Sequence, residues 1–273
     1  MEWIKVIILG IIQGITEWLP ISSTGHLLLF EHWVGLTMYD DPLLNADFFN
    51  LFLVVIQFGS ILAIVYLFFR RLNPFDPRKT QKAKRSTIRL WIKLIIGCIP
   101  TGFIGLLLND FIDRYFHTSF VIAVMLITYG VAFIVIENHP ITEKVHTLDQ
   151  LSYGTAFKIG CAQTLAIVPG TSRSGATIVG SLLLGVNRTV ATEFSFFLAC
   201  PVMLGASLLK VFSYGAGINW IGWLAILLGT FVSFVVSLFA VKYLLVYIRK
   251  HDFKAFGYYR IILGLIVLLT VFF

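Results

Sequence analysis

The sequence has little charge and little cysteine. Only 13% of its 273 residues are Asp, Glu, Lys or Arg, whereas 58% are hydrophobic. A typical soluble chain has about 25% charged residues, so this chain has too little polar surface to cover a water-soluble globule. Its three cysteines, Cys98, Cys161 and Cys200, lie in apolar stretches at spacings that match neither a disulfide framework nor a zinc site. The composition therefore predicts an integral membrane protein without a disulfide scaffold.

The N-terminus also lacks the basic start of a secretory signal peptide. It begins with Met1, Glu2 and Trp3, and Gln13 and Glu17 interrupt the apolar stretch that follows. We therefore expect this segment to be part of the mature structure.

The sequence contains several long apolar runs. Six runs are each long enough for the roughly 20 residues that cross about 30 Å of hydrocarbon. They cover residues 48–69, 90–108, 118–136, 190–212, 218–248 and 256–273. The pattern predicts an all-α polytopic membrane protein with six transmembrane helices.

The net charge of +7 is concentrated in two regions. One is residues 70–93, and the other contains Arg249, Lys250, Lys254 and Arg260. A basic run can bind nucleic acid, but between spanning helices the positive-inside rule explains it better. We therefore place both regions in the cytoplasm, expect no nucleic-acid partner, and place residue 48 and the turns at 109–118 and 213–217 outside.

Two further segments are too short to cross the membrane. Residues 2–36 and 155–187 each contain two helical pieces of about 12 to 15 residues, about 18 to 22 Å long, joined by a break rich in Pro, Gly, Ser and Thr. We predict two re-entrant helical hairpins, because the following spans keep their orientation only if each hairpin returns to its own side. Irregular backbone at that depth needs hydrogen bonds from protein or from a polar cavity. The breaks should therefore line a polar pocket.

The two hairpins repeat one sequence pattern. Residues 10–13 (GIIQ) and 20–25 (PISSTG) resemble residues 160–163 (GCAQ) and 169–175 (PGTSRSG), at an offset of 149 to 150 residues. Because the hairpins enter from opposite sides, the pattern predicts one membrane domain, residues 1–273, made of inverted-topology repeats of approximately 1–138 and 155–273. The two breaks should meet near the bilayer midplane.

Arg173 is the most informative residue of the second break. An unpaired arginine at that depth costs at least about 2.5 to 3.5 kcal/mol and is normally kept for function. Helix N-termini and arginine both favour phosphate-like anions, so we expect Arg173 and the starts of the two returning helices to bind such an anion. The alternative is a structural ion pair with Glu17. The expected N-caps are Ser22 or Ser23 in the first hairpin and Ser172 or Ser174 in the second.

Glu17, Ser23 and His26 form a carboxylate, hydroxyl and imidazole set suited to general-base or nucleophilic chemistry. Glu17 shares a helix face with Gln13, and it could orient His26 or help to bind a divalent cation. Because Gln13 supplies an amide in place of a second carboxylate, a complete protein cage for a metal is not expected. The alternatives are a capping Glu17, a satisfied helix histidine and hydroxyls bonded to their own helix. Gln57 either reaches the pocket or bonds a neighbouring helix.

The motifs resemble a known family. The stretch QGITEWLPISSTGH, residues 13–26, resembles the [E/Q]xxxE and PVSSTGH region of the undecaprenyl-diphosphatase (bacitracin resistance) family, and PGTSRSGAT, residues 169–177, is similar to its PGxSRSxxT motif. The resemblance covers nearly the whole chain, including residues 193–196 (EFSF). Two departures are small, since Ile21 stands for Val and Gln13 takes the permitted Gln option.

The resemblance implies hydrolysis of undecaprenyl diphosphate to the monophosphate, which recycles the lipid carrier for bacterial cell-wall synthesis and confers bacitracin resistance. It implies an inverted-repeat fold in the cell membrane, with a pocket that opens to the outer face. It also implies help from a divalent cation such as Mg²⁺ or Ca²⁺, and no organic cofactor. The catalytic residues expected are Glu17, Ser23, His26 and Arg173, with Glu17 as the metal ligand. The substrate contacts expected are Gln13, Ser22, Thr24, Gln57, Ser172, Ser174 and Thr177.

Other function classes stay open at this point. A prenyl-phosphate transporter or flippase is one, because many secondary transporters are built from inverted repeats with broken helices. The absence of further intramembrane charges for ion coupling argues against it, and a structural membrane subunit would tolerate Arg173→Ala. We expect a polyprenyl diphosphate substrate among membrane lipids, and a homodimer is a further alternative.

Overall fold

The computed structural model describes the backbone of residues 1–139 and 141–272, and their side chains except those of residues 109, 110, 113, 271 and 272. The regular secondary structure of this part of the chain is helical, apart from one isolated parallel bridge between Val145 and Val186. The helices are α1 (Glu2–Thr16), α2 (Ser23–Trp33), α3 (Pro42–Leu67), α4 (Phe69–Leu72), α5 (Gln81–Phe116), α6 (Ser119–Asn138), α7 (Tyr153–Thr164), α8 (Arg173–Leu183), α9 (Arg188–Tyr214), α10 (Trp220–Tyr247) and α11 (Lys254–Phe272), with 3-10 turns η1 (Leu165–Ile167) and η2 (Gly215–Gly217).

Five stretches of the described chain are helical, long and apolar enough to cross a membrane. They are Pro42–Leu67, Gln81–Leu108, Ser119–Asn138, Arg188–Gly217 and Trp220–Tyr247. They coincide with the first five predicted runs, so the prediction of an all-helical, multi-pass membrane protein is confirmed. The sixth run, 256–273, falls on α11 and extends beyond the described residues.

Single polar residues determine where the long helices begin. Asp41, Thr80, Thr118, Asn187 and Asn219 are the N-caps of α3, α5, α6, α9 and α10, and each side chain accepts a hydrogen bond from an amide of the first turn. Such a cap satisfies a donor that has no partner inside the helix. The boundaries of the apolar runs therefore have a local physical cause.

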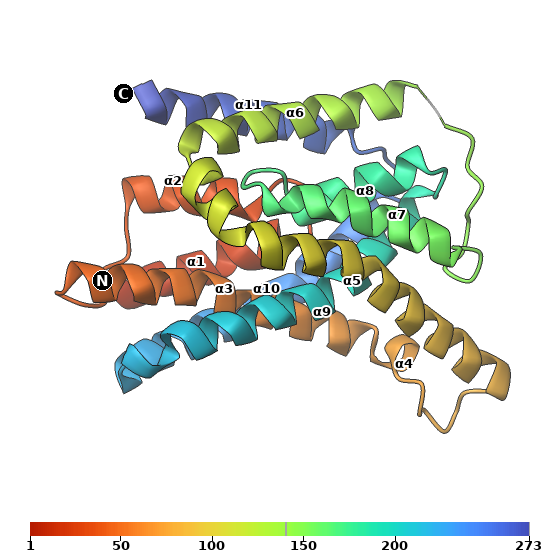
Figure 1. Ribbon diagram of the computed structural model, residues 1–273, viewed down its shortest axis with the longest axis horizontal. Helices are drawn as coiled ribbons and strands as arrows, with labels where there is room; N and C mark the ends of the chain where they lie inside the picture. Colours follow the sequence, from red (N-terminus) through yellow and green to blue (C-terminus); the bar gives the residue numbers. More distant parts are fainter. Residues whose placement is uncertain (140, 273) are drawn as a thin grey trace.

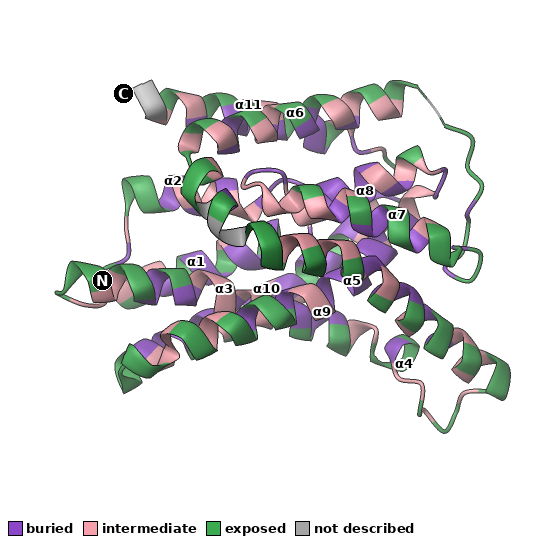
Figure 2. Cartoon of the chain, viewed as in Figure 1, coloured by how far each residue is buried: buried purple, intermediate pink, exposed green. Residues whose placement is uncertain are grey.

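Apolar side chains cover the outside of the helix bundle. Leu106, Phe212 and Phe239 are 79%, 83% and 70% exposed. Figure 2 shows buried residues concentrated where the helices meet and exposed residues along the outer faces. An apolar exterior of this extent is favourable in hydrocarbon and unfavourable in water, which agrees with a membrane environment.

Two helix pairs are too short to span. The helices α1 and α2 have 15 and 11 residues, and α7 and α8 have 12 and 11. At 1.5 Å per residue they are about 16 to 23 Å long, less than the roughly 30 Å of a hydrocarbon core. In Figure 1 the first pair lies toward the left end of the bundle and the second toward the right end, with their breaks between them.

Glycines bring these short helices close to their neighbours. A Cβ atom at Gly160 in α7 would lie 2.1 Å from the Gly97 carbonyl oxygen in α5. A Cβ atom at Gly10 in α1 would lie 2.8 Å from the Gly229 carbonyl oxygen in α10. No real Cβ makes contacts this short, so α1 and α7 rest directly on the backbones of α10 and α5. This packing positions both breaks inside the bundle.

Candidate active site at the two helix breaks

The two breaks have the same backbone conformation. Ser22 and Ser172 have φ values of 72° and 70°, and they are the non-glycine residues with positive φ in the described chain. Each is the N-cap of the helix that follows, and its Oγ accepts a hydrogen bond from Gly25 or Gly175. Of the alternatives left open by the sequence, the caps are therefore Ser22 and Ser172. A non-glycine residue in this region costs of order 1 to 3 kcal/mol, and such strain is concentrated at functional sites.

An ion pair joins the two breaks. Arg173 Nη2 donates to Glu17 Oε1 at 3.0 Å, which connects the start of α8 to the end of α1. Arg173 Nη1 donates to the Ser195 carbonyl oxygen at 2.9 Å, and the guanidinium lies 5.4 Å from the centre of the Trp18 ring. The ion pair with Glu17, which the sequence left open as the alternative for Arg173, is therefore present. The Arg173 Nε is buried, and no residue of the described chain accepts a hydrogen bond from it.

The Glu17 carboxylate lies at the centre of the site and is 8% exposed. Its Oε2 accepts hydrogen bonds from Gln13 Nε2 at 2.8 Å and from Ser23 Oγ at 3.3 Å. A carboxylate within hydrogen-bond reach of a hydroxyl can take its proton when that hydroxyl attacks an electrophile. The structure therefore places the Ser23 hydroxyl within hydrogen-bond reach of the Glu17 carboxylate.

His26 has other partners than those expected from the sequence. Its Nδ1 lies 2.7 Å from the Ser22 carbonyl oxygen, and its Nε2 lies 2.7 Å from the Tyr259 hydroxyl, with the two rings stacked. A carbonyl only accepts, so Nδ1 donates and Nε2 accepts from Tyr259 in the neutral tautomer. In the described structure Glu17 does not hydrogen-bond to His26. The expectation that Glu17 orients His26 is therefore wrong for this geometry, since Ser22 and Tyr259 do so.

Ser174 and Thr177 support the site. Ser174 Oγ donates to the Leu19 carbonyl oxygen at 3.4 Å, which is a second link between the breaks. Thr177 Oγ1 bonds back to the carbonyl oxygen of Arg173 and lies 2.6 Å from Ser195 Oγ. The Ser195 carbonyl oxygen accepts a hydrogen bond from Arg173, so Thr177 and Ser195 help to position the arginine.

Two expected contacts are not part of this network. Thr24 and Gln57 are half-buried, and no hydrogen bond in the described structure involves either side chain. Thr24 lies in the first turn of α2, one residue after Ser23, whereas Gln57 lies within α3. The structure therefore gives no contact that draws Gln57 into the site.

Sequence reasoning misplaced Arg260. It lies in α11, is fully buried, and was expected in a cytoplasmic basic region. Its guanidinium donates to five backbone carbonyl oxygens, those of Pro20, Met125, Leu126, Gly170 and Thr171. The expectation that the membrane part holds no further charge is also wrong. Arg260 lies inside the apolar run 256–273, and this location was the feature of the sequence that could have predicted its burial.

The donor set does not fit a resident metal. The described residues contain no group of three or more His, Cys, Asp or Glu side chains that could hold an ion. Both oxygens of Glu17, the expected ligand, already accept hydrogen bonds, and the Arg173 cation is 3.0 Å away.

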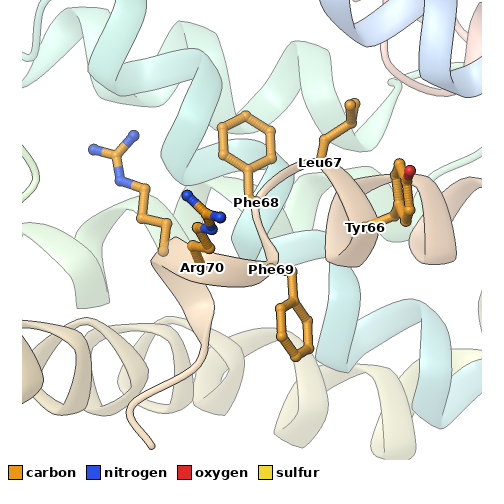
Figure 3. Close-up of a pocket in the computed structure, with 6 residues that line it drawn as sticks. Tyr66, Leu67, Phe68, Phe69 and Arg70 are labelled. Carbon is orange, nitrogen blue, oxygen red and sulfur yellow. The ribbon is translucent and has the colours of Figure 1, made fainter. Parts of the chain in front are cut away.

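A hollow of about 540 Å³ lies away from the breaks. It is lined by residues 66–71 where α3 ends and α4 begins, and Figure 3 shows Phe68 and Phe69 pointing to opposite sides of the chain there. Arg71, on its edge, pairs with Glu193 at 2.8 Å, which gives Glu193 a structural role. The hollow contains none of the residues of the two breaks, so it is not the candidate site.

Comparisons with known proteins agree with the motifs. Residues 6–266 match the family described as bacitracin resistance protein BacA. The chain is 52% identical over 268 residues to undecaprenyl-diphosphatase 1 of Clostridioides difficile (strain 630), covering 98% of this chain and 96% of that relative. It is 52% identical to an undecaprenyl-diphosphatase of Desulfitobacterium hafniense over 98% of this chain and 96% of the relative, and 49% identical to one of Enterococcus faecalis over 98% and 97%.

Proposed function

Because this chain belongs to the bacitracin resistance protein BacA family, we propose that it is an integral membrane phosphatase that hydrolyses undecaprenyl diphosphate to undecaprenyl phosphate and inorganic phosphate. This reaction recycles the lipid carrier of cell-wall synthesis. The observation that supports it best is the ion pair between Glu17 and Arg173, because it brings a carboxylate, a hydroxyl and an arginine from both breaks to one place. A nucleophile, a base and a cation that stabilises developing negative charge are groups that phosphoryl transfer uses.

The diphosphate binds between the starts of α2 and α8. The amides of the first helical residues, Ser23 and Arg173, have no partner inside their own helices, and the helix dipoles favour an anion there. Arg173 adds its unsatisfied Nε donor. These groups hold the terminal phosphoryl group and stabilise the negative charge that develops on it during transfer.

The terminal phosphorus is attacked by the Ser23 hydroxyl, and Glu17 Oε2 accepts the proton. The bond from phosphorus to the bridging oxygen breaks, and undecaprenyl phosphate leaves. Water then cleaves the phosphoseryl group and releases inorganic phosphate. In the alternative route Glu17 activates a water that attacks directly. In the covalent route His26, held by Tyr259 with Nε2 unprotonated, takes the proton of the water that cleaves the phosphoseryl group, and undecaprenyl phosphate leaves as an anion without a proton.

The proposed architecture is six spans and two re-entrant hairpins in an inverted repeat. Ser22 and Gly25 in the first hairpin correspond to Ser172 and Gly175 in the second, each at an offset of 150 residues and with the same cap hydrogen bond. The helix contacts support the repeat. If α1, α5 and α6 of the first repeat correspond to α7, α10 and α11 of the second, then the packing of α1 on α10 has its equivalent in the packing of α7 on α5, and α6 packs on its own counterpart α11.

The proposed site opens to the outer face of the bacterial cell membrane. In Figure 1 the α2–α3 connection lies at the opposite end of the bundle from the basic α4–α5 connection, which the positive-inside rule places in the cytoplasm. Tyr259, the partner of His26, is 45% exposed on the apolar exterior. The prenyl chain therefore lies along the lipid-facing side of α2 and α11 while its diphosphate reaches the breaks.

We expect Ser23→Ala to lower phosphate release from a prenyl diphosphate by about a thousandfold or more, since loss of a nucleophile removes the covalent route. The measurement is inorganic phosphate release by purified protein in detergent. The matched control is Ser207→Ala, because Ser207 is a buried serine that bonds the Val54 carbonyl oxygen away from the breaks. A Ser23→Ala variant with more than about a tenth of normal turnover would assign the attack to water.

We expect Tyr259→Phe to lower kcat by about 10- to 100-fold and to change KM little. The phenyl ring keeps the stacking on His26, but the hydroxyl that holds Nε2 is lost. Tyr258→Phe, the same change at the neighbouring exposed tyrosine, serves as the control. Equal kcat values for the two variants would contradict a role for Tyr259 in orienting His26.

The assay also separates this function from transport. Phosphate release in detergent does not depend on a second compartment, so a transporter or a structural subunit would release none. A divalent cation and a homodimer stay predictions, and adding or chelating Mg²⁺ or Ca²⁺ in the same assay tests the first.

A further inference from the structure

Arg260 is a buried positive charge that pairs with no carboxylate among the described side chains. Its side chain is fully buried, and in the described structure its hydrogen bonds all go to backbone carbonyl oxygens, at 2.9 to 3.4 Å. Its guanidinium also lies 5.6 Å from the centre of the Tyr129 ring. Carbonyl dipoles and an aromatic face reduce the cost of burying a cation, but they do not neutralise its charge.

The carbonyl oxygens that Arg260 binds come from both breaks. Nη1 donates to Pro20 of the first break, and Nη2 donates to Gly170 and Thr171 of the second. These oxygens belong to residues one or two positions before the strained caps, Ser22 and Ser172. One planar group with five N–H donors therefore determines the distance between the two helix starts.

Arg260 also lies beside the start of α8. A Cβ atom built on Gly175 would lie 3.2 Å from Arg260 Nη1, and Gly175 is in the first turn of that helix. The positive end of the helix dipole and the guanidinium are thus close together. This arrangement is unfavourable by itself and becomes favourable when an anion binds nearby.

The charges of the site do not balance. Arg173 and Glu17 form a neutral pair, and the hydrogen bonds of His26 correspond to its neutral tautomer. Of these four residues, Arg260 alone contributes a charge that nothing in the group offsets. The anion that enters the site would supply the missing negative charge.

We propose that Arg260 is a positioning residue that holds the two breaks in register and that its charge increases the affinity of the site for a diphosphate group. This inference rests on the proposed function, since it identifies what makes that site select a diphosphate. It concerns binding and alignment, because Arg260 contacts backbone groups of the site and takes no part in proton transfer.

The test compares Arg260→Gln and Arg260→Lys with the wild-type protein in detergent. Inorganic pyrophosphate is the probe, and two quantities are measured: the rise in melting temperature that it causes, and its Ki against prenyl diphosphate hydrolysis. Arg249→Gln is the matched control, because it removes the same charge from an exposed residue.

Arg260→Gln is expected to raise the Ki for pyrophosphate by about tenfold or more and to lose most of the thermal shift, as loss of a charged binding partner does. Arg260→Lys keeps the charge but cannot reach all the carbonyl oxygens. It is expected to keep Ki within about threefold of wild type and to lower kcat by about tenfold or more. If Arg260→Gln does not fold, the lowered kcat and nearly unchanged Ki of Arg260→Lys still carry the test.

Two results would overturn the inference. One is an equal pyrophosphate-induced shift, or none, in wild type and Arg260→Gln. The other is an Arg260→Lys variant with normal kcat. If wild type binds pyrophosphate in this manner but releases no phosphate from a prenyl diphosphate, the proposed function fails and the role of Arg260 in anion binding stands.

Discussion

Arg173→Ala is expected to abolish phosphate release, with a loss of about a thousandfold or more in kcat/KM, as for arginines that stabilise the transition state of phosphoryl transfer. The substitution removes the Nε donor that lacks a protein partner and the guanidinium that joins α8 to Glu17. It also leaves the Glu17 carboxylate buried without its cation. The measurement is phosphate release from undecaprenyl diphosphate, together with thermal melting of the same preparation.

The structure requires a control for stability in this experiment. Breaking a buried ion pair by removing one partner costs about 3 to 5 kcal/mol, so Arg173→Ala alone could lose activity by unfolding. Adding Glu17→Gln removes the unpaired charge and is expected to restore much of the melting temperature without restoring activity. Arg249→Ala, at an exposed arginine, should leave both quantities unchanged. Near-normal turnover in Arg173→Ala would remove this residue from the mechanism.

Gly160→Ala is expected to destabilise the protein by about 2 kcal/mol or more and to reduce activity with it, because overpacking at a rigid contact costs about this much. The added Cβ would lie 2.1 Å from the Gly97 carbonyl oxygen, 2.8 Å from its carbon and 2.9 Å from its Cα. These are backbone atoms, so α7 must move away from α5. That movement would displace the second break, which begins a few residues later.

Gly102→Ala and Gly205→Ala are the matched controls. Both glycines lie within helices, and a Cβ at either position would meet no atom within 4 Å. Alanine is a better helix former than glycine by about 1 kcal/mol, so these variants should be as stable as wild type or more stable. A Gly160→Ala variant that melts like the controls would contradict the direct backbone contact between α5 and α7.

The sequence predicted the elements and the break positions well, because these depend on local properties. Apolar length identifies a span, and a Pro, Gly and Ser cluster interrupts a helix whatever its neighbours are. The caps were narrowed to two serines in each hairpin by the same local reasoning. The sequence could not choose between them, since the positive φ of Ser22 and Ser172 depends on how the surrounding bundle holds each break.

Partners far apart in the chain were harder to predict. Arg173 and Glu17 are separated by 156 residues, and the sequence allowed either an ion pair between them or an arginine that binds an anion. His26 and Tyr259 are separated by 233 residues, and no motif in the sequence singled out Tyr259. Arg260 was assigned to a cytoplasmic basic region because it is close to Lys254 in sequence. A helix can begin at the membrane interface, however, and be buried about two turns later.

The most direct measurement is a double-mutant cycle between Glu17→Gln and Arg173→Gln, with kcat/KM for undecaprenyl diphosphate as the readout. Residues that act together in one site have strongly non-additive effects. If the two breaks form a single active site, the double variant should be scarcely less active than the worse single variant. Fully additive losses would mean that Glu17 and Arg173 act independently, and would contradict a shared site.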